Sequence, residues 1–368
     1  MSTTTPPIAA TRTAEARVTR SAQPSGWLLP VAAGAIVLLA FMPSLLSQGD
    51  LSTMMNAFIL LTMAVMWNLL AGYAGMVSIG QQAFIGLGAE GVLAMAQHGL
   101  NPVASIPLAA IATAAIALPV SLLVFRLRGG YFAIATWVVA DTAELVVSSI
   151  SSLGSGTGSP VPGLSGLSAK SFGDITYWAA LAVALVALGM AYLLLRSRLG
   201  LVLAAVRDDE VGARSAGARV MAARRIVFAV AALGCGAAGA LLAVSQLNVQ
   251  PSSVFSVQWS AEMIFVTLIG GIGTLEGPII GTILFFVLEQ SLAQHGALYL
   301  IVLGSVAVVV AIWAPRGIWG TIASKLRFRL FPVGYWLWAQ GAVRGREAGS
   351  VQARLAGRRR RRPEDPPA

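Results

Sequence analysis

The stretch RSRLGLVLAAVRDDEVGARSAGARVMAARR, from Arg196 to Arg225, is a polar island in a chain that is otherwise nearly all apolar. It holds seven arginines and the acidic run Asp208-Asp209-Glu210. Because apolar runs flank it at Ile175–Leu195 and Ile226–Leu247, we interpret it as a loop between two membrane helices. Its excess of arginine predicts that the loop lies on the cytoplasmic side.

The length of this loop indicates a further role. A connection that only reverses the chain needs about five residues, and this one is much longer, helical in pattern and of mixed charge. These properties favour a contact with something in the cytoplasm. A solvated basic loop that merely follows the positive-inside rule is the alternative.

The composition excludes soluble folds. Of the 368 residues, 57% are hydrophobic and 11% are charged, which is typical of a membrane protein that crosses the bilayer several times. The apolar runs are long and continuous, so they predict helices and not barrel strands. We therefore expect an all-α membrane helix bundle with about eight to ten membrane segments, some of them broken or re-entrant.

The charged and reactive residues argue against several other functions. The net charge of +10 comes from arginines in loops and tails, where lipid headgroups and topology explain them, so we expect contact with membrane lipid and no nucleic-acid partner. A single cysteine, Cys235, and two distant histidines, His98 and His295, predict no disulfide and no metal site. The chain has no phosphate-binding loop and no recognisable catalytic motif, so we expect neither catalytic residues nor ATP binding by the chain itself.

The distribution of charge suggests three parts. Residues 1–26 are expected to be a flexible cytoplasmic leader, residues 27–320 a membrane domain that includes the 196–225 loop, and residues 321–368 a basic cytoplasmic tail. The short basic turn Arg126–Arg128 is expected on the same side as the arginine-rich loop. The segments 151–173 and 248–260 are expected on the opposite, external side. The membrane segments are expected at 27–46, 51–70, 83–96, 103–125, 131–150, 175–195, 226–247 and 297–314.

Two regions are expected to interrupt the helices. The first is AGYAGMVSIGQQAFIGLGAEG at 71–91, whose glycines at 72, 75, 80, 86, 88 and 91 should break or thin the helix. The second is LIGGIGTLEGPIIG at 268–281, at the centre of the apolar segment Ala261–Gln290. Two full crossings need about 40 residues, so this segment predicts two half-helices that enter and return. Irregular backbone at membrane depth should line a pathway.

The two irregular regions are weakly similar to each other. Residues 71–75, AGYAG, parallel residues 269–273, IGGIG. Breaks at corresponding places in two halves are typical of transporters built from repeats. Chance similarity in a chain with 39 glycines is the alternative.

Polar residues within the apolar segments are the remaining signal, because each is costly at the bilayer centre unless it faces protein or water. They are Asn68, Gln81, Gln82 and Glu90 near the first irregular region, Asp141 and Glu144 in one segment, and Glu262, Glu276 and Glu289 near the second. Together they favour a hydrophilic route between helices. Hydrogen bonds between neighbouring helices are the alternative for each residue taken singly.

Several motifs occur in the order found in one known family. They are NLLAGYAG (68–75), FIGLGA (84–89), RGGYFAIAT (128–136), SRLG (197–200), RDDE (207–210), ARSAG (213–217), GGIGTLEGP (270–278) and PRGIWG (315–320). In these motifs the chain resembles the branched-chain amino acid ABC transporter permease family, specifically its LivM-type subunit. The resemblance covers residues 68 to about 320.

The resemblance implies an importer subunit in a bacterial inner membrane. Its expected partners are a second homologous permease, two cytoplasmic ATP-binding subunits that bind the ATP, and an extracytoplasmic solute-binding protein. The expected cargo is a branched-chain aliphatic amino acid. The cytoplasmic loop would dock on an ATPase through a coupling helix, with Arg207, Asp208, Asp209, Glu210, Ala213 and Gly217 as the coupling residues. The substrate pathway is expected to include Asn68, Gly72, Gly75, Ser78, Gln81, Gln82, Asp141, Gly271, Gly273 and Thr274.

Two alternatives remain open at this point. The same class of importer could carry urea or short amides. A proton-driven secondary transporter, using Asp141, Glu144 and Glu90, would need no ATPase.

Overall fold

The structure is a computed structural model that describes residues 16–20, 28–153, 156–163, 168–292, 298–314, 317–326 and 335–339. The chain divides into two compact units, residues 1–23 with 333–368 and residues 24–332. The first unit contains an antiparallel pair of strands, β1 (Ala16–Arg20) and β4 (Tyr335–Ala339). Residues from the two ends of the chain therefore meet in this unit.

Some sequence predictions fall outside the described residues. They concern most of the leader (1–15 and 21–26), most of the basic tail including Arg358–Arg362, His295, and the first two residues of the PRGIWG motif. The boundaries at 26 and 320 stay predictions.

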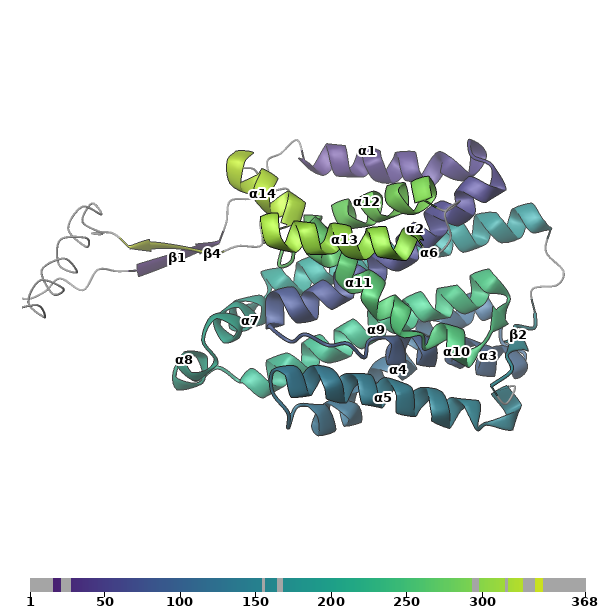
Figure 1. The fold of residues 1–368 in the computed structure, drawn as a ribbon, viewed down its shortest axis with the longest axis horizontal. Helices are drawn as coiled ribbons and strands as arrows, with labels where there is room; N and C mark the ends of the chain where they lie inside the picture. Colours follow the sequence, from purple (N-terminus) through teal and green to yellow (C-terminus); the bar gives the residue numbers. More distant parts are fainter. Residues whose placement is uncertain are drawn as a thin grey trace, which may run out of the picture. The chain divides into compact units, whose positions relative to one another are not determined.

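The larger unit is helical, as the sequence predicts (Figure 1). Its helices are α1 (Leu28–Phe41), α2 (Gln48–Asn68), α3 (Gln82–Gln97), α4 (Pro102–Val124), α5 (Gly130–Ser148), α6 (Ala169–Arg196), α7 (Arg198–Asp208), α8 (Glu210–Ser215), α9 (Val220–Gln246), α10 (Pro251–Val254), α11 (Val257–Gly270), α12 (Glu276–Leu292), α13 (Leu298–Trp313) and α14 (Gly317–Leu326). Short helical turns occupy Met42–Ser44 and Ser151–Leu153, and a π-helical turn, Leu69–Tyr73, extends α2.

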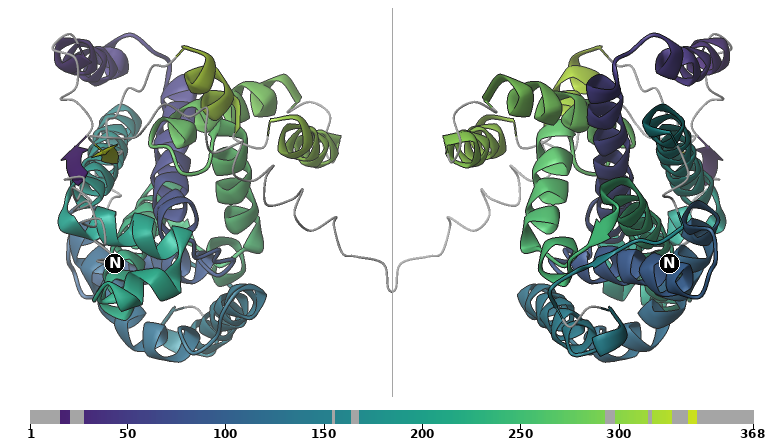
Figure 2. Two further views of the ribbon diagram at one scale, coloured as in Figure 1. Left: turned by 90° about the vertical axis from the view of Figure 1, so that its left-hand side faces the viewer. Right: turned by 90° about the vertical axis from the view of Figure 1, so that its right-hand side faces the viewer.

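Six helical segments among the described residues are long and apolar enough to cross a membrane. They are Gln48–Tyr73, Pro102–Val124, Gly130–Ser148, Ala169–Arg196, Val220–Gln246 and Pro251–Gly270. The chain is therefore a multi-pass membrane protein. Helices α1 and α13 lie at the outer edges of the helical unit (Figure 2), and α1 is held there by a hydrogen bond from Tyr177 Oη to the Leu39 carbonyl, 2.7 Å long.

Polar caps explain where several helices begin. In each case a side-chain oxygen at the N-cap accepts a backbone N–H of the first turn, which would otherwise lack a partner. The caps are Ser47 for α2, Asn101 for α4, Ser168 for α6, Ser197 for α7 and Ser256 for α11.

Helix α9 lies at the centre and packs against α2, α3, α4 and α6. The contacts are close because α9 carries glycine where its neighbours approach: a Cβ added at Gly239 would lie 1.9 Å from the Ile85 carbonyl oxygen of α3. Gly234 receives the Met66 side chain of α2, and Gly236 receives Thr113 of α4. Small residues let membrane helices pack backbone to backbone.

The prediction that Gly86, Gly88 and Gly91 interrupt the helix is wrong. Helix α3 runs without a break from Gln82 to Gln97. Its glycines are instead packing positions: a Cβ at Gly88 would lie 2.0 Å from the Gly236 carbonyl oxygen. Here tertiary contact outweighs the low helix propensity of glycine.

The two basic segments lie at the same end of the helices, as predicted. Helices α7 and α8 project at one end (Figure 1), and the turn between α4 and α5 borders the same pocket as Glu210 and Arg224. We call this the basic end. The loops before α6 and after α9 also share an end, because β2 (Ser159–Pro160) pairs with β3 (Asn248–Val249).

Helices α11 and α12 form a hairpin, as predicted, but its first arm is not the short half-helix that the sequence predicts. They run antiparallel, since Gly270 approaches Gly277 and Val266 approaches Gly281. The sequence predicts that the hairpin lies within the thirty residues Ala261–Gln290, but the hairpin is longer than that. Its first arm begins at Pro251, ten residues before the expected start, so Pro251–Gly270 is long enough to cross a membrane. The reason is local: Pro251 starts α10, and Ser256 then caps α11.

Candidate functional site

The first break is residues 69–81, which comprise the π-helical turn Leu69–Tyr73 and the segment between it and α3. After the π-helical turn, Gly75 takes a positive φ of 67° and the chain folds back along the end of α2. The Met76 N–H donates to the Leu70 carbonyl at 3.0 Å, and Trp67 Nε1 donates to the Ser78 carbonyl at 2.8 Å. The break is thus an extended return segment held by α2 itself.

The second break is residues 271–275, between α11 and α12. Gly271 and Gly273 take positive φ values of 132° and 76°, which allow the tight reversal. Thr274 Oγ1 donates to the Gly271 carbonyl at 2.8 Å and accepts the Gly277 N–H at 3.0 Å. Thr274 therefore closes the turn and caps the first turn of α12.

Asn68 joins the two breaks. Its side chain is fully buried, accepts the Gly273 N–H at Oδ1 (2.8 Å) and donates from Nδ2 to the Thr274 carbonyl (2.7 Å). Beside it, a Cβ added at Gly72 would lie 2.6 Å from the Gly273 nitrogen. The structure therefore brings together four predicted pathway residues, Asn68, Gly72, Gly273 and Thr274, with Gly271 in the same turn. We call this meeting point the break junction.

Arg207 reaches the break junction from the arginine-rich loop. Its Nη1 donates to the Gly72 carbonyl at 2.9 Å, and its Nε lies 3.3 Å from Asp208 Oδ1. The side chain also passes Gly75, where an added Cβ would lie 3.5 Å from Arg207 Cγ. The second break therefore lies at the basic end, beside the loop.

The arginine-rich loop is folded. The predicted single coupling element at 207–217 is two helices, because α7 ends at Asp208 and Asp209 caps α8 by accepting the Val211 N–H at 3.0 Å. Gly217, with a φ of 83°, turns the chain toward α9. Val206, Ala213 and Val220 form a small apolar core between the three helices. This core and the cap give the loop a defined shape.

Glu210 is the electrostatic centre of the loop. It bonds Arg214 Nη2 at 2.6 Å and Arg224 Nη2 at 2.9 Å. Partial burial by itself raises the pKa of the Glu210 carboxyl, but Arg224, Arg214 and Arg128 more than offset this and hold the pKa below its ordinary value. The carboxylate is therefore charged at neutral pH and fixes α8 to the start of α9.

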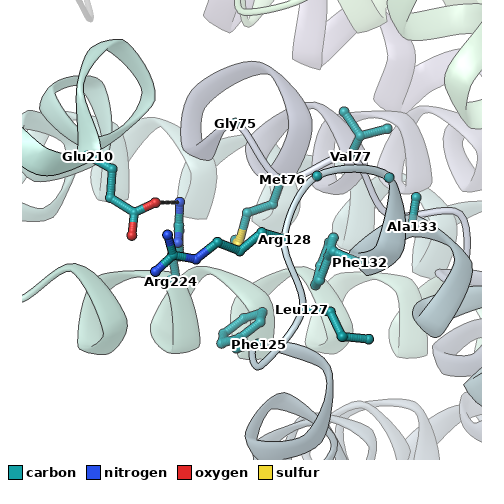
Figure 3. Close-up of a pocket in the computed structure, with 12 residues that line it drawn as sticks. Gly75, Met76, Val77, Phe125, Leu127, Arg128, Phe132, Ala133, Glu210 and Arg224 are labelled. Atoms are coloured by element: carbon teal, nitrogen blue, oxygen red, sulfur yellow. Dashed lines mark hydrogen bonds and ion pairs between the residues drawn. The ribbon is translucent and has the colours of Figure 1, made fainter.

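A pocket of about 330 Å³ adjoins the first break at the basic end (Figure 3). Its polar wall is Arg128, Glu210 and Arg224, and its apolar wall includes Phe125 and Phe132. In Figure 3 the Arg128 side chain extends toward the Glu210–Arg224 pair, with the Phe125 ring beside the arginines and Phe132 farther from them.

Three other predicted pathway residues are packed inside the chain. Gln81 Nε2 donates to Ser78 Oγ at 3.3 Å, the Cys235 thiol lies 3.5 Å from Gln81 Oε1, and Ser260 donates to Gln82 Oε1. Ser78, Gln81 and Gln82 are fully buried. They connect the first break to α9 and α11.

Asp141 lies apart from the other predicted pathway residues. It is exposed on α5, in a stripe of exposed side chains with helical spacing. The stripe consists of Tyr131, Ile134, Val138, Asp141 and Leu145. No described helix of this chain covers that face.

Sequence reasoning missed several contacts. Thr136, which accepts the Ile79 N–H at 3.3 Å, and Ser260, which holds Gln82, were not singled out. Thr136 is the last residue of the RGGYFAIAT motif, so the motif could have pointed to this contact. Ser260 sits in a stretch that was expected to be an external loop, and nothing local marks it.

A family model described as "Branched-chain amino acid transport system / permease component" matches residues 51–311, well over half of the chain. The chain belongs to this permease family. The match contains both breaks and the arginine-rich loop. Family membership identifies the chain as a transport component and not an enzyme.

Two curated relatives resemble the permease over most of their length. The high-affinity branched-chain amino acid transport system permease protein LivM of Salmonella typhimurium is 27% identical over 324 residues, which cover 80% of this chain and 75% of the relative. The LivM protein of Escherichia coli K12 is 26% identical over 343 residues, covering 85% and 77%. No solved structure matches the chain significantly.

Proposed function

We propose that this permease is the membrane subunit of an ATP-driven importer for branched-chain aliphatic amino acids. In this proposal it pairs with a second, homologous permease, two cytoplasmic ATP-binding subunits hold the ATP, and an extracytoplasmic binding protein delivers the substrate. The observation that carries the proposal is the folded α7–α8 loop. A projecting loop with its own apolar core and caps is suited to receive a rigid push.

The proposed topology has ten membrane segments in a bacterial inner membrane. The α7–α8 loop and both chain ends are cytoplasmic, and the hairpin α11–α12 supplies two of the segments. Arginines at the basic end support this orientation through the positive-inside rule.

The exposed stripe of α5 supports the paired permease. A carboxylate facing lipid at the middle of a membrane helix costs about 2.5–3.5 kcal/mol on insertion scales. Asp141 is exposed in this chain. In the proposed assembly its stripe faces the second permease and a water-filled route between the two subunits.

Docking of the ATPase is assigned to the outer face of α8. Val211 is 74% exposed there, beside the buried Ala213. An exposed apolar side chain on a polar cytoplasmic helix is suited to a pocket on a partner.

The test is co-purification of the full importer with its ATPases, comparing wild type with Val211→Asp. A charge in place of an apolar anchor should lower bound ATPase about tenfold, with a matching loss of ATP-dependent leucine uptake in vesicles. The control is Leu100→Asp, which changes a 49% exposed apolar residue at the opposite end. Retention of ATPase by Val211→Asp would contradict the docking assignment.

The same vesicles distinguish the alternatives. Isoleucine and valine should compete with leucine for uptake. Competition by urea or acetamide, without competition by isoleucine or valine, would identify urea or a short amide as the cargo. Uptake by wild type without any ATPase would favour a proton-driven transporter.

A further inference from the structure

Arg207 differs from the other arginines of the loop. All seven arginines between 196 and 225 are described, and Arg207 alone donates to a backbone carbonyl of a break. Arg214 and Arg224 are paired with Glu210 inside the loop, and Arg196 bonds Tyr192 on its own helix. The side chain of Arg207 is 42% exposed, so it is anchored at the junction without being fully buried.

The guanidinium of Arg207 lies between the two breaks. On one side it holds the Gly72 carbonyl at 2.9 Å. On the other side, a Cβ added at Gly273 would lie 3.6 Å from Arg207 Nη1. A methyl group at Gly273 would be in ordinary van der Waals contact with the guanidinium, so Arg207 lies directly beside the second break.

Asn68 extends this connection to the second hairpin. It lies one helical turn before Gly72 and holds Gly273 and Thr274 by their backbone groups. A displacement of Gly72 is therefore passed to 271–275 through the two hydrogen bonds of the fully buried Asn68 side chain, which are 2.7 and 2.8 Å long. Packed elements of this kind transmit small shifts because they deform little.

We propose that Arg207 is a positioning residue that transmits movement of the α7–α8 loop to both breaks at once. This inference rests on the proposed function, because it assumes that an ATPase moves the loop. It differs from the sequence prediction in one respect. Arg207 does not serve to bind the ATPase; it connects a loop docked through other residues to the membrane helices.

The experiment uses the reconstituted importer with its ATPases and binding protein. It compares Arg207→Met and Arg207→Lys with wild type and with Arg198→Met, a control on the same helix whose arginine is exposed. Three quantities are measured: bound ATPase per permease, ATP hydrolysis, and leucine taken up per ATP hydrolysed.

Arg207→Met should keep its ATPase and its hydrolysis but lower leucine uptake per ATP about tenfold, since one charge-assisted hydrogen bond is lost. Arg207→Lys keeps the charge and should restore part of the uptake. Arg198→Met should match wild type. If Arg207→Met does not assemble, Arg207→Lys takes its place, and its leucine uptake per ATP hydrolysed should be lower than that of wild type.

Two results would overturn the inference. Loss of bound ATPase in an assembled Arg207 variant would make Arg207 a docking residue, and an unchanged uptake-to-ATP ratio would remove its role. Failure of the proposed function is distinguishable, because wild-type uptake would then proceed without ATPase.

Discussion

The two breaks begin with similar sequences and form different structures. AGYAG at 71–75 leads into an extended return that ends only at Gln82, whereas IGGIG at 269–273 reverses within a tight turn and α12 starts at Glu276. The residues that follow explain the difference. Thr274 and Glu276 are helix-start residues that follow Gly273 at once, whereas the comparable residues after Gly75, Ser78 and Gln81, come later, and α3 starts only at Gln82. The glycines permit a break, and the next few residues decide its length.

The breaks also differ in how they are held. The first is held by its own helix, through Trp67 and Leu70, and by buried side chains such as Gln81. The second is held by Thr274 within the turn and by Asn68 from a distant helix. The second break should therefore depend more on single residues, and the following changes test that difference.

The largest effect is expected for Gly72→Ala. The added methyl group would lie 2.6 Å from the Gly273 nitrogen and 2.3 Å from Asn68 Oδ1, so the breaks must separate. Overpacking of this kind costs about 1–3 kcal/mol. Because separating the breaks also breaks the Asn68 hydrogen bonds to the second break, this cost adds to theirs and the total should exceed that of losing the Asn68 bonds alone. The measurement is thermal unfolding of purified permease. Gly189→Ala, where nothing lies within 4 Å, is the control, and equal melting of both variants would show that the junction is loose.

Asn68→Ala should come next. It leaves the Gly273 N–H and the Thr274 carbonyl unpaired in a buried place, and each unsatisfied group costs about 1–3 kcal/mol. Hydrogen exchange should rise at 271–275 and stay nearly unchanged at 76–78, because the first break keeps its bonds to α2. An equal rise in both segments would contradict the stronger dependence of the second break on Asn68.

Matched removal of one hydroxyl from each break should give a smaller effect. Thr274→Val removes bonds of 2.8 and 3.0 Å and should cost about 1–2 kcal/mol. Ser78→Ala removes two bonds of 3.3 Å and should cost under about 1 kcal/mol. Chemical denaturation measures both. A greater loss of unfolding free energy for Ser78→Ala would show that the first break, and not the second, depends more on a single hydroxyl group.

The smallest effect concerns pH, and it separates the loop from the breaks. The pKa of Glu210 is lowered in the folded protein from an ordinary value of 4.5, so its ion pairs stabilise α8 above that value. This stability, at most about 1 kcal/mol for a partly exposed pair, is lost as pH falls below 4.5 through the folded pKa. Hydrogen exchange of Glu210–Ser215, corrected for its intrinsic pH dependence, should show lower protection there. Glu210→Gln should remove the pH response, and a response that persists would assign it to another group.

Much of the fold could be predicted from local patterns. Continuous apolar runs located the long helices, and arginine-rich segments were correctly grouped at one end. The hairpin at 271–275 was predicted from its glycines and proline, but its length was underestimated because the Ser256 cap was not recognised. Gly88 shows the limit of composition: the same residue type that breaks a helix at Gly75 packs one helix on another at Gly88.

The site was predicted less completely. Asn68 and Arg207 were singled out as a polar group in an apolar run and as part of a charged loop. Their partners lie 205 and 135 positions away in sequence, at Gly273 and Gly72, and are backbone groups. Backbone acceptors and donors are present at every residue, so no side-chain pattern reveals which of them will be used.

The hydrogen bonds of Asn68 have a consequence for how this family can diverge. Asn68 recognises main-chain atoms of the second break and not its side chains. A side chain such as Ile272 can therefore be exchanged during evolution while the hydrogen bonds persist, provided that the glycines on either side keep their conformations. Position 68 has no such freedom. Related permeases should accordingly vary more at 272 than at 68, even though both positions lie at the same junction.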